Sequence, residues 1–141
     1  MSGRRAGAVA GWVLALCLLG GCTSARSELG TPDGACCLAL PTATRAVGPH
    51  SRLLGVRRLT PTSLGHLAPS LAADLSSGEP SGEQICVLAF AGSFTAATVA
   101  KPVGLPSGPV AVVVTRAPSN RLIGTVIVTR APLHFGHAHI G

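Results

Sequence analysis

The chain has 141 residues, enough for one small domain, either alone or behind a targeting segment. Hydrophobic residues make up 47% of the sequence and charged residues 11%, which excludes a highly charged, intrinsically disordered chain. The formal net charge is +6, so the protein is mildly basic.

The first 22 residues have the organisation of a secretion signal. Arg4 and Arg5 form a short basic start, and an apolar run follows at residues 6–19. This run is shorter than the roughly 20 residues that a membrane-spanning helix needs. It leads into Leu19-Gly20-Gly21-Cys22, where small residues stand directly before a cysteine.

This Leu-Gly-Gly-Cys sequence, behind a basic start and an apolar core, resembles the lipobox of bacterial lipoproteins. The resemblance implies that the Cys22 thiol receives a diacylglyceryl group and that the chain is cut between Gly21 and Cys22. Two or three acyl chains, at about 0.8 kcal/mol per buried methylene, would then anchor the protein permanently. Two alternatives are an ordinary secretory signal cut nearby, with Cys22 incidental, and an uncleaved anchor.

The predicted organisation is a signal peptide at residues 1–21, a lipidated cysteine with its tether at 22–35, and one domain at 36–141. The tether prediction rests on the polar sequence TSARSELGTPDGA at residues 23–35, which Gly and Pro interrupt and which is typical of a flexible linker.

Within the domain, β-branched and apolar runs predict strands, the first at residues 53–59 and the others at 85–91, 111–115 and 122–129. Loops are predicted at residues 76–84 and 99–109. Leucines recur at helical spacing at positions 64, 67, 71 and 75, but Gly65 and Pro69 interrupt them. We therefore expect one short helix from about Pro69 to Leu75. The fold class is a small, strand-rich α+β domain.

The last two predicted strands are joined by RAPSNR at residues 116–121, which predicts a C-terminal β-hairpin. Pro118 presets φ, and Asn120 is the non-glycine residue best suited to the left-handed conformation. The hairpin is similar to the closing strands of PepSY-type envelope domains, with Leu122-Ile123-Gly124 in the return strand. The usual acidic residue and glycine of that turn are absent here, and the resemblance implies only how the hairpin folds.

Three cysteines remain in the domain if Cys22 is acylated: Cys36, Cys37 and Cys86. Disulfides form outside the cytosol, so we expect a structural bridge from Cys86 to either Cys36 or Cys37. A bridge that closes so long a loop contributes about 4 kcal/mol in the loop-entropy model. The adjacent pair lacks the C-x-x-C spacing of a redox site.

The C-terminus carries His134, His137 and His139 in the pattern H-x-x-H-x-H. Three imidazoles can hold zinc or copper. No carboxylate lies nearby in the sequence to orient the rings, so the histidines are candidates to which no metal is assigned. No cofactor is expected.

Catalytic motifs give little support for an enzyme, and we expect none. Ser81 and Ser107 each stand one place late for a G-x-S-x-G nucleophile elbow. His66, Ser70 and Asp74 are close in sequence, but closeness in sequence does not make a triad.

The charges are unevenly distributed along the chain. All five acidic residues precede residue 84, and from there on the formally charged residues are Lys101, Arg116, Arg121 and Arg130. Such a segment could favour an anionic headgroup surface or polymer. The alternative is that these cations discourage edge-to-edge pairing of strands. Nucleic acid is not an expected partner, because there is no basic cluster beyond Arg57-Arg58 and no aromatic platform.

Together these patterns predict a lipoprotein on the extracytoplasmic face of the cell membrane, acting as a non-enzymatic binding or accessory module. The bias toward Ala, Gly, Pro and Arg is typical of a GC-rich genome and suggests an actinobacterial source. Expected partners are the bilayer, through acylated Cys22, and an envelope protein or anionic surface. The alternative function is an envelope metal-binding protein that uses His134, His137 and His139.

Overall fold

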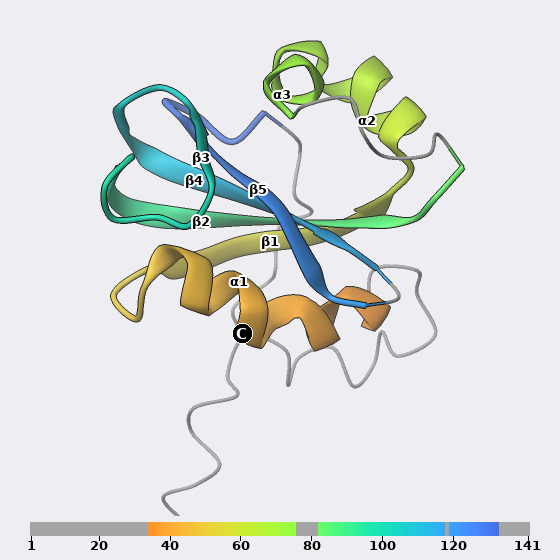
Figure 1. Cartoon of the computed structure of the whole chain (residues 1–141), viewed down its shortest axis with the longest axis horizontal. Helices are drawn as coiled ribbons and strands as arrows, with labels where there is room; N and C mark the ends of the chain where they lie inside the picture. Colours follow the sequence, from red (N-terminus) through yellow and green to blue (C-terminus); the bar gives the residue numbers. More distant parts are fainter. Residues whose placement is uncertain (1–33, 76–81, 118, 133–141) are drawn as a thin grey trace, which may run out of the picture.

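The computed structural model of the chain describes residues 34–75, 82–117 and 119–132 (Figure 1). Within these ranges five strands form one sheet: β1 (Arg52–Leu59), β2 (Ile85–Thr95), β3 (Pro102–Gly104), β4 (Ser107–Arg116) and β5 (Arg121–Val128). The helical segments of the same ranges are the 3-10 helix η3 (Gly34–Ala39) and the α-helices α1 (Leu40–Val47), α2 (Pro61–Leu67) and α3 (Pro69–Asp74).

The sheet is the middle layer of three. Its strands lie in the order β1-β2-β4-β5-β3, antiparallel except for β3, which pairs in parallel with β5. Figure 1 shows η3 and α1 on one face of the sheet and α2 with α3 on the other. Each face therefore buries its own apolar core against helices.

The two central strands carry most of both cores. Residues 85–90 of β2 and 110–115 of β4 are all buried. Their sequences, ICVLAF and VAVVVT, are almost continuously apolar, as expected for strands that are covered on both faces. Cys86, Leu88 and Phe90 face η3 and α1, and the residues between them face α2 and α3.

The α1 helix is built from small residues that allow it to approach the sheet closely. Ala43, Ala46 and Val47 are buried, and Pro41 occupies the first turn, where a proline is tolerated. The helix ends at Gly48, whose φ of 89° suits glycine and whose N–H donates to the carbonyl oxygen of Thr44 at 2.8 Å.

The α2 and α3 helices are two short pieces separated at Ala68. The Thr60 hydroxyl caps α2 by accepting a hydrogen bond from the Ser63 N–H at 3.1 Å. Ala68 has φ −147° and ψ 74° because a residue before proline, here Pro69, is pushed out of the helical region.

The predicted α+β class and the C-terminal hairpin are confirmed. The four predicted strands are β1, β2, β4 and β5, and β2 and β4 each extend several residues beyond the predicted ranges. Asn120, in the turn between β4 and β5, has a φ of 55° and is left-handed, as predicted.

The helix content was underestimated. The one short helix expected from about Pro69 to Leu75 is α3, but η3, α1 and α2 are present as well. The sequence of α1, LPTATRAV, has no broad stripe of large apolar residues, so its helical character depends on the sheet against which its alanines pack. Gly65 lies within α2 and did not end it.

The predicted loop at residues 99–109 is also corrected, because it contains β3 and the first residues of β4. β3 has three residues and gains its hydrogen bonds from β5, which is remote in the sequence. A strand of three residues is too short to show an alternating hydrophobic pattern in the sequence. The η3 helix begins at Gly34, two residues before the predicted start of the domain.

Candidate functional site

Strand pairing brings four arginines together at one end of the sheet, called here the arginine end: Arg57, Arg58, Arg116 and Arg121. Arg57 and Arg58 lie near the end of β1, while Arg116 ends β4 and Arg121 begins β5. In the registers, Arg58 pairs with Cys86, and Arg116 pairs with both Ile85 and Arg121. The four arginines therefore lie within the last three rows of residues that are paired across the strands.

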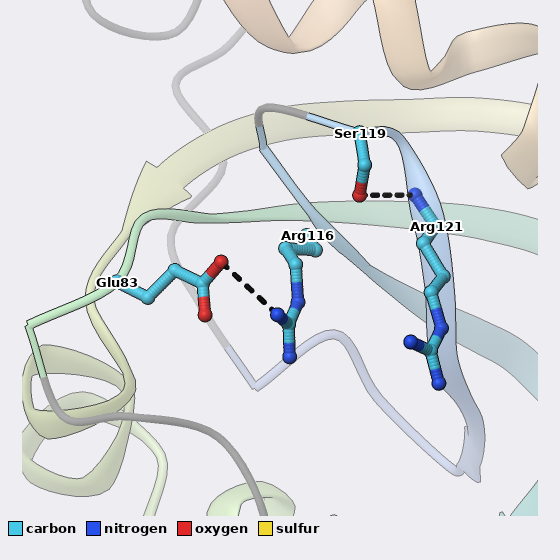
Figure 2. A network of polar contacts seen from close by, with 4 residues as sticks. All are labelled: Glu83, Arg116, Ser119 and Arg121. Carbon is cyan, nitrogen blue, oxygen red and sulfur yellow. Dashed lines mark hydrogen bonds and ion pairs between the residues drawn. The ribbon is translucent and has the colours of Figure 1, made fainter.

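Three of these side chains, those of Arg57, Arg116 and Arg121, share the face that α2 and α3 cover. Arg57 pairs with Val87 and Arg116 with Ile85, and both partners belong to the core on that face. Arg58 pairs with Cys86, which faces η3 and α1. Figure 2 shows the side chains of Arg116 and Arg121 extending in the same direction from neighbouring strands.

Arg116 is held in place by a carboxylate. Its Nη1 lies 3.3 Å from Oε1 of Glu83, which stands just before β2 (Figure 2). The two side chains are 28% and 22% exposed, so the ion pair is half-buried and less screened than a surface pair. Glu83 thus orients one arginine and neutralises part of the positive charge at this end.

Arg121 is exposed and lies beside the turn that joins β4 to β5. Its backbone N–H donates to the hydroxyl of Ser119 at 3.4 Å (Figure 2). The Asn120 N–H donates to the carbonyl oxygen of Arg116 at 2.8 Å. The turn therefore fixes the backbone from which the Arg121 side chain projects.

The described chain begins at this same end. Cys36 in η3 is bonded to Cys86, and Cys86 is the strand partner of both Arg58 and Thr115. In Figure 1 the orange η3 lies beneath the β4–β5 turn. Leu38, in the same helix, is 73% exposed.

Acidic residues are few around the arginine end. The structure describes two of them, Asp74 and Glu83. Asp74 ends α3, and its Oδ2 lies beside Gly104, which pairs with Ile127 toward the opposite end of β5. Within the described ranges, Glu83 is therefore the one carboxylate that these registers place among the four arginines.

Other residues singled out in the sequence have mixed outcomes. Cys22 and the histidines at 134, 137 and 139 lie outside the residues that the structure describes. Cys86 is bonded to Cys36, one of the two expected partners, while Cys37 is a half-buried free thiol. Among the described residues, no group of three or more His, Cys, Asp or Glu side chains is placed to hold a metal ion.

The hydrolytic candidates lie on separate elements from the four arginines. His66 is on α2, Ser70 and Asp74 are on α3, and all three are exposed. Ser107 begins β4 at the opposite end from Arg116, while Ser81 lies outside the described ranges.

The arginine end suits anionic ligands, because guanidinium groups bind phosphate and carboxylate oxygens through paired N–H donors. Sequence reasoning treated Arg57-Arg58 as an isolated pair and the later cations as scattered. The signal that was missed is positional: arginines occur where β1 and β4 end and where β5 begins.

Comparison with protein-family models, with curated proteins and with solved structures finds no match to this chain. In the described part of the chain, no helix has both the length and the apolar character needed to cross a bilayer.

Proposed function

We propose that this protein is a lipoprotein of the bacterial cell envelope, held on the extracytoplasmic face of the membrane by acyl groups on Cys22. Its domain is a binding or accessory module rather than an enzyme, and the arginine end is its binding surface.

The observation that carries the proposal is the sequence Leu19-Gly20-Gly21-Cys22 behind Arg4, Arg5 and an apolar run at residues 6–19. The run is long enough for a signal peptide and short for a spanning helix. A cysteine directly after small residues is the position at which lipoprotein processing modifies and cuts a chain.

Two further features support this location. Cys36 and Cys86 are bonded, and structural disulfides persist in oxidising compartments such as the cell envelope. The arginine end carries chemistry for anionic partners, and it lies where the polypeptide enters the domain from the side of Cys22.

The experiment is the intact mass of the protein expressed in a bacterium that processes lipoproteins and extracted in detergent. The expected mass is that of a chain beginning at Cys22 plus two or three acyl chains. The Cys22→Ala variant should lack the acyl mass, whereas Cys37→Ala should keep it. A wild-type chain without acyl groups, whether cut elsewhere or uncut, would contradict the proposal.

A further inference from the structure

We propose that the arginine end docks the domain onto the anionic phospholipid headgroups of the membrane that carries its anchor. This inference rests on the proposed function, because the acyl groups on Cys22 are what bring the domain to the bilayer. It adds an orientation: the β4–β5 turn and η3 face the lipid, and the opposite end of the sheet faces away.

The first step is the position of the anchor relative to the fold. Gly34 follows Cys22 by twelve residues, so in any conformation the two lie no more than about 40 Å apart. Gly34 opens η3, and the Cys36–Cys86 bond fixes η3 beside the last rows of the sheet. Among the described elements, η3 is therefore the one that follows Cys22 most closely in the chain, and it lies at the arginine end.

The second step is charge. The arginine end brings four guanidinium groups together, and Glu83 is the carboxylate placed among them in the described ranges. Each basic residue near an anionic leaflet strengthens membrane association by about fivefold. The attraction falls off over a Debye length of about 8 Å at physiological ionic strength, so it acts only when this end is at the surface.

The third step is an exposed apolar side chain at the same end of the sheet. Leu38 belongs to η3, two residues after Cys36, and is 73% exposed. Leu38 lies on the face of the sheet that η3 and α1 cover, whereas Arg57, Arg116 and Arg121 lie on the opposite face, so the apolar and basic side chains flank the same end of the sheet. With this end against the bilayer, Leu38 can enter the interface between headgroups and acyl chains while Arg121, the exposed arginine of the four, contacts phosphate oxygens.

The experiment uses the acylated chain in lipid vesicles and measures hydrogen–deuterium exchange by mass spectrometry. One set of vesicles contains about one third phosphatidylglycerol, to reproduce an anionic leaflet, and the other is pure phosphatidylcholine. We expect the β4–β5 turn to exchange about fivefold more slowly on the anionic vesicles. The loop at residues 96–100, beyond the other end of β2, is the internal reference and should not change.

Matched variants separate the arginine end from net charge. Arg121→Gln should weaken the difference between the two kinds of vesicle, because it removes the exposed guanidinium group beside the turn, and Arg130→Gln should not, although both residues are exposed and lie near opposite ends of β5. The double variants R57Q/R121Q and R52Q/R130Q repeat the comparison with equal loss of charge, and circular dichroism checks that each is folded.

The apolar contact has its own pair of variants. Leu38→Gln should weaken protection of the turn, whereas Leu105→Gln, which alters an exposed leucine near the end of β5, should leave it intact. Salt near 1 M, where the Debye length is about 3 Å, should abolish the protection on anionic vesicles.

Failure of the docking inference can be distinguished from failure of the proposed function. An acylated, vesicle-bound chain whose turn exchanges equally on both kinds of vesicle would overturn the docking inference and leave the proposed function standing. Protection that R130Q removes as effectively as R121Q would also overturn it, because net charge would then suffice. A chain that carries no acyl groups overturns the proposed function, and the docking inference with it.

Discussion

Asn120 shows how one backbone conformation positions a side chain of the arginine end. Its φ of 55° closes the turn between β4 and β5, and its N–H donates to the carbonyl oxygen of Arg116 at 2.8 Å. Arg121 follows directly, so the left-handed residue determines where that guanidinium group projects. Asparagine tolerates this conformation, whereas most side chains place Cβ too close to the following carbonyl oxygen.

We therefore predict that Asn120→Ala lowers the free energy of unfolding by about 1 kcal/mol, because alanine keeps the steric cost without the compensation that asparagine provides. Asn120→Gly should stay within a few tenths of a kcal/mol of the wild type. Urea unfolding followed by circular dichroism measures both. Equal stability of the alanine and glycine variants would show that the turn does not require a left-handed residue.

The disulfide acts at the scale of elements, because it joins η3 to the central strand β2. Cys36 and Cys86 are 50 residues apart in the sequence, and β1, α2 and α3 all lie in the loop that they close. Cys36 is also completely buried in the core between the sheet and α1. The bridge thus holds the arginine end to η3, the first described element of the chain.

Reduction of this bridge should lower the free energy of unfolding by about 4 kcal/mol, the loop-entropy value for a separation of 50 residues. The measurement is urea unfolding with and without a phosphine reductant, with the two-dalton mass increase as evidence of reduction. Cys37→Ser provides the control, since Cys37 is free and should be replaceable at a cost below about 0.5 kcal/mol. Unfolding midpoints unaffected by the reductant would argue against the bridge.

At the scale of the whole molecule, the sequence predicted the fold better than the site. β-branched runs identify β2, β4 and β5, since their burial on both faces makes them almost continuously apolar. The helices were harder to predict. Leu64 and Leu71 are both buried, but Pro69 divides their helical pattern into α2 and α3, and only the second piece was expected.

The arginine end could not be predicted because it depends on the order of strands. Arg58 and Arg116 are far apart in the sequence and come to the same end of the sheet only because β2 lies between β1 and β4. No local pattern in the sequence encodes the order of the strands. That order also determines which strand ends lie beside η3. The lipobox-like segment is different, since its evidence is entirely local and lies outside the residues that the structure describes.

The domain should fold without the residues that precede it, because every residue of the two described cores lies between Cys36 and Ala131. We predict that a chain beginning at Asp33 unfolds cooperatively, within about 0.5 kcal/mol of one beginning at Thr23.

A chain beginning at Cys37 is the matched control for that truncation. It loses Cys36, and with it both a buried side chain and the bridge to Cys86, so it should be less stable by about 4 kcal/mol. Urea unfolding of the three non-acylated chains compares them directly. A loss of cooperativity in the chain that starts at Asp33 would mean that residues 23–32 contribute to the fold, and the arginine end would then have to be placed relative to an extended domain instead of a separate anchor.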